Sequence, residues 1–223
     1  MSLVVIVPAA GSGIRFGAGV PKQFQPLGGK PLLQHVVERF LLDDNILRVI
    51  VAVAEPLLAN VKQTPGDRTS FVAGGATRQQ SVANALAAAP EETTLVAIHD
   101  AVRPFFSNDV FASVVAAATE QGAALPVLPL NDTIHLVRNE MVVQSVDRST
   151  LAAAQTPQCF RIEVLREVLE RAEREGLEST DEAGLAAHFG FPVKAVGGDS
   201  MNFKITRPED LMLAELLLKE WTK

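Results

Sequence analysis

The sequence predicts an α/β fold in which helices flank a Rossmann-like, mostly parallel, twisted sheet, and a β-hairpin arm protrudes from it. One observation is that short apolar runs alternate with amphipathic runs along the chain, which is typical of βαβ units. Another is that the 223 residues, 48% hydrophobic and 21% charged, suit one folded domain over 1–223. A change of pattern after Pro129 separates the arm from the rest.

The first half of the chain supplies parallel strands and the helices between them. Residues 3–7 form an unbroken apolar run, as expected for a strand buried on both faces. After Pro31, apolar residues recur at helical spacing, and Thr77 can cap an Ala-rich helix over 78–89. Further strands are expected at 49–53, 71–73 and 95–98, and a further helix, capped by Ser107 or Asn108, ends near 121.

The second half contains the arm, expected at about 132–155. Residues 132–147 predict a β-hairpin with a turn near Asn139 and Glu140, and its second strand carries apolar residues. A lone two-stranded hairpin is marginal in water and cannot bury those residues, so we expect the arm to pack against a second subunit of a homodimer. The remaining elements are helices at 163–174 and 181–189, strands at 193–196 and 202–206, and a closing helix from Pro208.

The charge balance and the residue counts exclude several classes of protein. A net charge of −6 argues against nonspecific nucleic-acid binding, which needs a basic surface. The single cysteine, Cys159, allows no intramolecular disulfide or thiolate metal cage, and we interpret it as a packing residue. The four histidines are scattered, so no histidine-based metal site is expected. No segment resembles a signal peptide or a membrane span, which predicts a cytoplasmic protein without membrane partners.

The segment after the first strand predicts a phosphate-binding loop. Residues 9–13 are small, so backbone amides can approach a polyanion, and Arg15 and Lys22 add fixed positive charge. This is not a Walker A loop, because its last glycine is followed by Ala18 instead of lysine. A dinucleotide fingerprint would need a small residue where Phe16 stands, which argues against a dehydrogenase. The loop therefore indicates a nucleotide-binding protein of another class.

Polar residues recur where the parallel strands are expected to end. Residues 74–78 follow the third strand, Asp100 and Arg103 follow the fourth, and Lys204 lies in the last. Ligands of open parallel sheets bind beyond the carboxyl ends of the strands, so we expect these side chains to converge on one rim. His99 next to Asp100 invites interpretation as a base or metal ligand, but we favour a structural role because the chemistry below does not require it.

Characteristic segments spread over nearly the whole chain are residues 8–16, 21–24, 74–82, 99–104, 132–133, 146–148, 155–158, 180–182 and 202–210. In these segments the sequence resembles the 2-C-methyl-D-erythritol 4-phosphate cytidylyltransferase family, nucleotidyltransferases with a glycosyltransferase-A-like fold. The resemblance implies transfer of the cytidylyl group of CTP to methylerythritol phosphate, with release of pyrophosphate, in non-mevalonate isoprenoid precursor biosynthesis. Ala76 departs from the pattern, because some relatives have an acidic residue there, and this weakens a side-chain role at that position.

The resemblance also implies roles for individual residues. Those that would stabilise charge on the reacting phosphates are Arg15, Lys22 and Lys204. Those that would bind the nucleotide are Ala9, Ala10, Gly11, Ser12, Gly13, Gly75, Ala76 and Ser81. Those that would bind the acceptor are Asp100, Arg103 and Thr180, with Thr133 and Arg148 supplied by the arm of a neighbouring subunit. Magnesium (Mg2+) would be held mainly by the CTP phosphates, with Asp100 as the best-placed protein ligand.

The charges of the substrates indicate how such a transfer would work. The second pKa of a phosphate monoester is about 6, so near neutral pH the attacking oxygen needs no general base. The barrier lies in bringing two polyanions together, which calls for cations and a metal. One alternative is a ribitol 5-phosphate cytidylyltransferase, whose acceptor is also a polyol phosphate. A second is a non-catalytic nucleotide-binding regulatory module, which would have less need of Arg15, Lys22 and Lys204 together.

Overall fold

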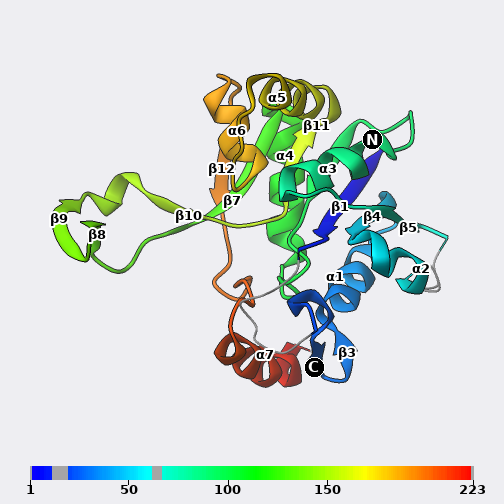
Figure 1. The fold of residues 1–223 in the computed structure, drawn as a ribbon, viewed down its shortest axis with the longest axis horizontal. Helices are drawn as coiled ribbons and strands as arrows, with labels where there is room; N and C mark the ends of the chain where they lie inside the picture. The colour runs from blue at the N-terminus through cyan, green and yellow to red at the C-terminus, as the bar shows by residue number, and fades with distance from the viewer. Residues whose placement is uncertain (1, 12–19, 62–66, 222–223) are drawn as a thin grey trace.

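The computed structural model describes residues 2–11, 20–61 and 67–221. Within these residues, eight strands form the central sheet in the order β10-β7-β11-β6-β1-β4-β5, with β12 also paired to β7 (Figure 1). Strands β1, β4, β5, β6, β7 and β12 share one direction, whereas β10 and β11 run antiparallel to their neighbours. The predicted fold class, a mostly parallel sheet flanked by helices, is confirmed.

The strands predicted from the apolar runs form one half of the sheet. They are β1 (Leu3–Ala9), β4 (Ile46–Val53), β5 (Thr69–Ala73) and β6 (Leu95–Ile98). Strand β1 lies between β6 and β4 and pairs in parallel with both. Successive side chains of β1 point to opposite faces of the sheet, and helices cover both faces. This explains why the run is apolar at consecutive positions.

The other half of the sheet is formed by β7 (Ala123–Pro129), β10 (Ala152–Ala154), β11 (Gln158–Arg161) and β12 (Lys194–Gly197). Strand β12 confirms the strand expected at 193–196, but the sequence did not predict the other three. The sequence of β7 includes proline, and β10 consists of alanine; both residue types are depleted in strands. These segments become strands because β7 pairs with β10, β11 and β12.

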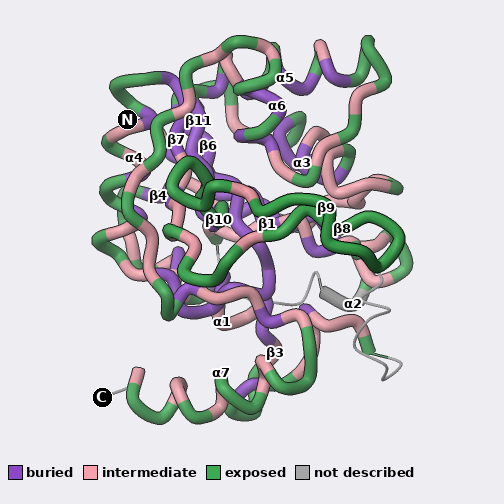
Figure 2. Tube along the Cα trace, turned by 90° about the vertical axis from the view of Figure 1, so that its left-hand side faces the viewer, coloured by how far each residue is buried: buried purple, intermediate pink, exposed green. Residues whose placement is uncertain are grey.

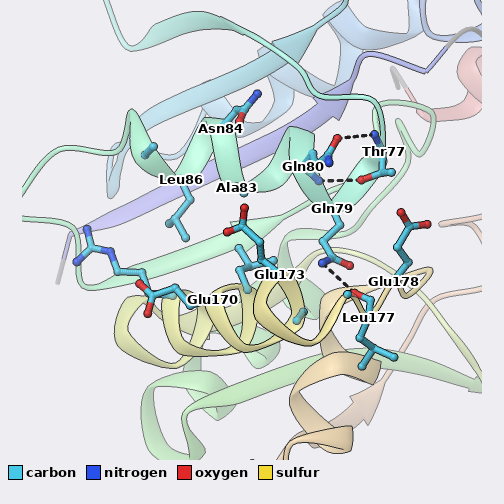
Figure 3. Close-up of a pocket in the computed structure, with 15 residues that line it drawn as sticks. Thr77, Gln79, Gln80, Ala83, Asn84, Leu86, Glu170, Glu173, Leu177 and Glu178 are labelled. Carbon is cyan, nitrogen blue, oxygen red and sulfur yellow. Dashed lines mark hydrogen bonds between the residues drawn. The ribbon is translucent and has the colours of Figure 1, made fainter.

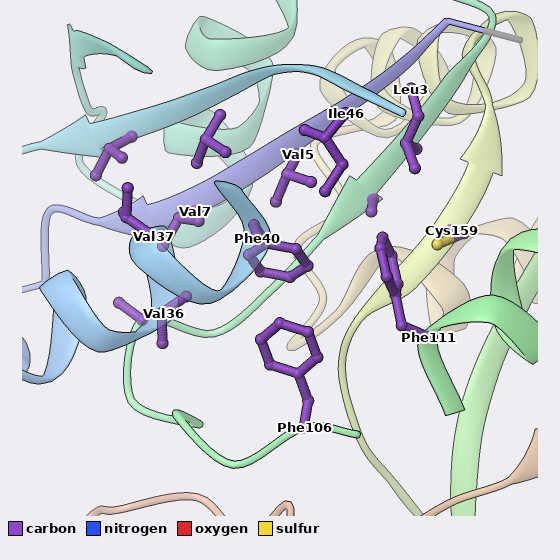
Figure 4. Packing of buried hydrophobic residues seen from close by; sticks show 14 of the residues in the cluster. Leu3, Val5, Val7, Val36, Val37, Phe40, Ile46, Phe106, Phe111 and Cys159 are labelled. Carbon is purple, nitrogen blue, oxygen red and sulfur yellow. The ribbon is translucent and has the colours of Figure 1, made fainter. Parts of the chain in front are cut away.

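Helices cover the sheet in two layers. One face packs against α1 (Leu32–Leu41) and α4 (Asn108–Gln121), and the rings of Phe40, Phe106 and Phe111 fill the space between them (Figure 4). The opposite face packs against α3 (Arg78–Ala87), α5 (Ile162–Glu175) and α6 (Glu182–His188). Cys159 is fully buried in the first layer, and burial raises the pKa of its thiol, which confirms its interpretation as a packing residue.

The closing helix α7 (Pro208–Trp221) begins at the predicted proline and packs on a third apolar cluster that includes Leu27, Val102 and Ile205. The strand expected at 202–206 is wrong. That segment is irregular, and the hydrogen bond from Ile205 N–H to the Val102 carbonyl, 2.9 Å long, is not continued into a ladder. Shorter elements are η2 (Lys22–Phe24), β2 (Pro26–Leu27), β3 (Lys30–Pro31), η3 (Glu55–Leu57), α2 (Leu58–Val61) and η4 (Arg148–Thr150).

The predicted hairpin is present as β8 (Ile134–Arg138) and β9 (Met141–Val146). Asn139 and Glu140 have φ values of 48° and 64°, as the tight turn between the strands requires. The hairpin projects from the body of the molecule (Figure 1), and nearly all of it is exposed (Figure 2). The range 132–155 expected for the arm takes in β10, which pairs with β7 in the main sheet. Among the described helices, none has the length and apolar character needed to cross a membrane.

Candidate active site

A pocket of about 430 Å³ lies at the carboxyl ends of β1, β5 and β6, the edge where the sequence places its polar residues. Its lining combines the loop after β1, the loop before α3, the turn after β6 and the segment before α7. The lining residues are Pro8, Ala9, Ala10, Gly11, Lys22, Gln23, Gly75, Ala76, Thr77, Arg78, Ser81, Asp100, Ala101, Val102 and Lys204. The predicted convergence on one rim is therefore observed for these segments.

The loop after β1 is fixed by a side chain from η2. The Gln23 amide is buried and donates hydrogen bonds to the Ala9 carbonyl, at 2.6 Å, and to the Gly11 carbonyl, at 2.9 Å. Two carbonyl oxygens that would repel a phosphate are thus already occupied, and the backbone of residues 9–11 is held in place. Ser12, Gly13 and Arg15 lie outside the described residues.

The loop before α3 packs tightly against the loop after β1. A Cβ atom built on Gly74 would lie 2.3 Å from the Ala10 Cβ, so only glycine fits at this approach. The Ser81 hydroxyl accepts a hydrogen bond from Gly75 N–H at 3.1 Å and donates one to the Thr77 carbonyl at 2.9 Å. Thr77 and Gln80 form a capping box, which confirms the predicted start of α3. The backbone of residues 75–77 therefore faces the pocket in a fixed shape.

Asp100 stands at the centre of the charged side chains. Its Oδ2 lies 3.0 Å from Lys204 Nζ and 3.1 Å from Arg103 Nε, and its Oδ1 lies 3.8 Å from Arg78 Nε. Burial alone would raise the pKa of Asp100, but Lys204, Arg78 and Arg103 outweigh it and hold that pKa well below its usual range. Asp100 is consequently an anion at neutral pH, and its charge keeps these three cations together at the edge of the sheet.

The turn that carries Asp100 and Arg103 is held by a buried chain of hydrogen bonds. The Asp100 N–H donates to the Thr156 hydroxyl at 3.1 Å, and His99 Nε2 lies 2.9 Å from the Arg103 carbonyl. Since Nε2 must donate to that carbonyl, Nδ1 accepts from the Thr156 hydroxyl, 3.1 Å away. Burial lowers the pKa of His99 to about 4, so the imidazole is neutral. This arrangement agrees with the structural role favoured for His99.

Arg103 is also fixed from the segment before α7. Its Nη1 donates to the Asn202 carbonyl at 2.7 Å, and the Asn202 side chain donates to the Thr156 carbonyl at 2.7 Å. Arg103 does not line the pocket itself and meets it through its ion pair with Asp100.

Arg78 lines the pocket and is paired with a buried acid. Its Nη1 lies 2.8 Å and 2.7 Å from the two carboxylate oxygens of Glu182, the first residue of α6. Burial lowers the pKa of Arg78, but the charges of Glu182 and Asp100 more than compensate and raise it. Burial raises the pKa of Glu182, and the charge of Arg78 opposes that shift. The arginine is therefore firmly charged at the pocket wall.

Four of the five predicted acceptor residues lie outside the pocket lining: Arg103, described above, and Thr133, Arg148 and Thr180. Thr133 and Arg148 flank the hairpin, and both are exposed. A hydrogen bond from Arg148 Nη1 to the Asn131 carbonyl holds the Arg148 guanidinium near the base of the arm. Thr180 is exposed and directly precedes Asp181, the N-cap of α6. The described chain therefore does not bring the two arm residues to its own pocket.

Sequence reasoning missed Gln23, Thr156, Glu182 and Asn202, and it gave Arg78 a place on the rim without a role. Each is a buried or half-buried polar residue within one of the characteristic segments. A weak signal was available in Arg78, a cation directly after the cap of a helix that opens on the rim. Gln23, Thr156, Glu182 and Asn202 make hydrogen bonds to the backbone or to side chains far away in the sequence, and no local sequence pattern reveals such contacts.

The acidic side chains limit what metal the pocket can hold. Across the part of the chain that the structure describes, no group of three or more His, Cys, Asp and Glu residues is placed to hold a metal ion. Asp100 is the acidic residue in the pocket lining, and its Oδ2 is already engaged by Arg103 and Lys204. Such a donor set fits magnesium held mainly by substrate phosphates, with at most one carboxylate from the protein.

A second hollow, of about 480 Å³, lies between α3 and α5 (Figure 3). Its walls include Glu170, Glu173 and Glu178, together with Gln79 and Asn84. None of the residues predicted to act on the substrates lines it, and its acidic walls are unsuited to a polyphosphate. The charged rim at the carboxyl ends of the strands remains the candidate active site.

Comparisons with known proteins show which family the chain is similar to. Residues 3–220 match the family model described as IspD, 2-C-methyl-D-erythritol 4-phosphate cytidylyltransferase. A protein of that name from Thermus thermophilus is 42% identical over 222 residues, covering 100% of both chains, and one from Solibacter usitatus is 38% identical over 236 residues, covering 99% of this chain and 97% of the relative. The crystal structure of the enzyme from Thermus thermophilus covers 98% of this chain and 100% of its own, with 40% identity and a TM-score of 0.84. That of the Francisella tularensis enzyme covers 97% and 99%, with 29% identity and a TM-score of 0.86.

Proposed function

This chain belongs to the 2-C-methyl-D-erythritol 4-phosphate cytidylyltransferase family, and we propose that its rim pocket carries out the family's reaction as follows. The enzyme transfers the cytidylyl group of CTP to 2-C-methyl-D-erythritol 4-phosphate, a step of isoprenoid precursor biosynthesis. An oxygen of the acceptor phosphate bonds to the α-phosphorus of CTP, and the bond from that phosphorus to the β-phosphate oxygen breaks. The products are 4-diphosphocytidyl-2-C-methyl-D-erythritol and pyrophosphate.

The nucleotide occupies the side of the pocket formed by the two packed loops. Backbone amides of Ala9, Ala10, Gly11, Ser12 and Gly13 hold the triphosphate, and Gly75, Ala76 and Ser81 surround cytosine and ribose. The support is that Gln23 already takes up carbonyl oxygens of the first loop and that Ser81 fixes the second. Preorganised amides of this kind lose little entropy when they bind an anion.

Arg15, Lys22 and Lys204 stabilise the charge that develops on the α-phosphate and the departing pyrophosphate. The observation that carries this assignment is that Lys204, from an irregular segment far along the chain, reaches the same pocket as Lys22 and the loop after β1. In the absence of substrate its ammonium rests 3.0 Å from Asp100 Oδ2. When phosphate oxygens arrive, the ammonium can turn toward them while Asp100 retains Arg78 and Arg103 as partners.

The acceptor binds beside Asp100, at the far side of the pocket. The Asp100 carboxylate meets its hydroxyl groups, with Thr180 nearby, and Arg103, which does not line the pocket, holds that carboxylate through their ion pair. Thr133 and Arg148 bind its phosphate from the arm of the partner in a homodimer. The exposed position of both arm residues, away from the pocket of their own chain, supports this assignment.

Magnesium would be held mainly by the CTP phosphates, with Asp100 Oδ1 as the protein oxygen best placed to join them. When bound, the ion supplies positive charge that neutralises phosphate oxygens. The acceptor monoester is largely deprotonated near neutral pH, so the protein needs to orient it and to supply no base. CTP is a nucleotide of the cell interior, and we therefore place the enzyme in the cytoplasm, which fractionation of source cells would test.

One assay tests the substrate assignment. The purified protein is incubated with magnesium and CTP and with methylerythritol 4-phosphate, ribitol 5-phosphate or glycerol 3-phosphate in turn, and pyrophosphate release is followed. We expect release with methylerythritol 4-phosphate to exceed that with the other two by at least roughly tenfold. Preferential release with ribitol 5-phosphate would overturn the acceptor assignment, and no release with any acceptor would favour a binding module.

A further inference from the structure

We infer that the buried ion pair between Arg78 and Glu182 positions the acceptor side of the pocket. Glu182 fixes the Arg78 guanidinium, and Arg78 in turn fixes the carboxylate of Asp100. Glu182 does not line the pocket, so it acts through Arg78 and is a positioning residue. The inference rests on the proposed function, because it takes Asp100 and Thr180 to be contacts of the acceptor.

The pair joins elements that are far apart in the chain. Arg78 is the first residue of α3 and Glu182 the first of α6, 104 positions later. The Glu182 side chain is 1% exposed and that of Arg78 is 25% exposed, so water screens the pair weakly. Arg78 Nη1 takes both Glu182 oxygens, which leaves its Nε directed to Asp100 Oδ1 at 3.8 Å.

The segment that contains Thr180 is anchored at both of its ends. On one side, Gln79 donates to the Leu177 carbonyl at 3.2 Å. On the other, the Gln158 amide donates to Asp181 Oδ2 at 2.8 Å and accepts from Ala183 N–H at 3.0 Å. The Arg78–Glu182 pair closes the same segment onto α3. Thr180 and Asp100, which come from different parts of the sequence, are therefore held relative to one another.

The balance of charge around Asp100 depends on this pair. Asp100 faces three cations, Lys204, Arg103 and Arg78. Glu182 draws Arg78 away from Asp100, since its contacts with Arg78 are about an ångström shorter than the 3.8 Å contact of Arg78 with Asp100. Without the Glu182 charge, Arg78 would move onto Asp100 and pull the carboxylate from its place beside Arg103. The acceptor side would change, while Gln23 and Ser81 would still hold the nucleotide loops.

The competing interpretation is that the pair only stabilises the packing of α3 against α6. A buried ion pair is often replaceable by two apolar side chains without loss of stability, whereas removal of one partner leaves an uncompensated charge. This difference separates the two interpretations. Apolar replacement of both partners would restore packing, but the contact between Arg78 Nε and Asp100 Oδ1 would be lost, so that oxygen would no longer be held.

The experiment compares Glu182→Gln with the double variant Arg78→Met, Glu182→Met, using Glu178→Gln, an exposed acid of the same segment, as the matched control. Thermal unfolding is measured together with the KM values for methylerythritol 4-phosphate and for CTP. For Glu182→Gln we expect the acceptor KM to rise about tenfold, the size of one lost charge-assisted hydrogen bond, with the CTP KM changed less than about twofold. The control should match the wild type in both.

The double variant is expected to unfold near the wild-type temperature and still to show the raised acceptor KM. A wild-type acceptor KM in a stable double variant, or equal rises in both KM values for Glu182→Gln, would overturn the inference. If the double variant does not fold, the test is whether Glu182→Gln raises the acceptor KM much more than the CTP KM. Failure of the proposed function is distinguishable, because the wild type itself would then show no transfer to this acceptor.

Discussion

The rim pocket and the arm both carry predicted substrate residues, but they differ in what surrounds those residues. Asp100 is nearly buried and is paired with cations from α3, its own turn and the segment before α7. Arg148 is exposed beside a hairpin whose Met141 and Val142 are 70% and 62% exposed. The chain therefore builds the charged cluster around Asp100 by itself, whereas the arm has apolar and polar groups that the described residues of its own chain leave uncovered. A second subunit would complete the arm.

The largest expected effect concerns the pocket. Lys204→Ala, and likewise Lys22→Ala, should lower kcat by roughly 10²-fold, because each removes a cation preorganised for the transition state. Steady-state kinetics with both substrates would measure this, with Lys194→Ala, an exposed lysine of β12, as the control. An unchanged kcat with only a higher KM for CTP would show that the lysines merely bind the nucleotide.

The next effect tests which subunit the arm serves. Lys204→Ala and Arg148→Ala are each expected to be poorly active, but an equal mixture that has exchanged subunits should recover roughly a quarter of wild-type activity, the share of sites with both groups intact. The specific activity of the mixture is compared with that of each variant alone. If the mixture has only the mean activity of the two variants, Arg148 serves the pocket of its own chain.

A substitution in the arm is expected to have a smaller effect on nucleotide binding in the pocket. Val142→Asp places a charge on the apolar face of the hairpin and should shift the protein toward monomers in sedimentation, with loss of acceptor turnover. CTP affinity should change less than about twofold, because the pocket is built within one chain. Glu140→Gln at the turn is the control. A dimer that persists in Val142→Asp would mean that the subunits associate through another surface.

The smallest effect on the reaction is expected from His99, which supports the turn beneath the pocket and acts on the free energy of unfolding. Burial lowers the pKa of His99 from 6.5 to about 4, so the unfolded chain takes up this proton at a higher pH than the folded chain does. The free energy of unfolding should therefore fall as the pH drops from about 6.5 to 4, by up to ~3 kcal/mol from this residue. Urea unfolding between pH 7 and 5 should show a shallower pH dependence in His99→Gln than in the wild type. His188→Gln, which changes an exposed histidine, is the control for the substitution itself; equal slopes in the wild type and in His99→Gln would contradict the assignment.

Some parts of the fold could be predicted because a local pattern determines them. The apolar run of β1 and the Thr77 cap of α3 are of this kind. Strands β7 and β10 could not be predicted, because their proline and alanine residues form strands only where neighbouring strands pair with them. The strand expected at 202–206 is wrong for the converse reason: an alternating pattern is present, but no strand lies alongside it to pair with in the described structure.

The candidate site divides in the same way. Most residues on the rim were predicted by their position after strands and by the family resemblance. Lys204 was expected on the same rim, but inside a strand at 202–206 that the structure does not contain. Gln23 and Glu182 were not predicted, because each contacts another residue of the chain rather than a substrate. Glu182 has the local pattern of an ordinary acid in the first turn of a helix. Only the three-dimensional structure brings it to an arginine 104 positions away.

The place of Lys204 in the order of the chain has a consequence for protein synthesis. A ribosome makes every strand of the central sheet before it reaches Lys204 and α7. The nascent chain can therefore assemble the sheet, the loop after β1 and the turn with Asp100 while one cation of the pocket is still missing. Translation would thus deliver a nucleotide-shaped pocket first and the capacity for transfer afterwards. A message cut short before codon 204 would remove Lys204 together with α7, and Leu27 and Val102 would lose the helix that packs on them.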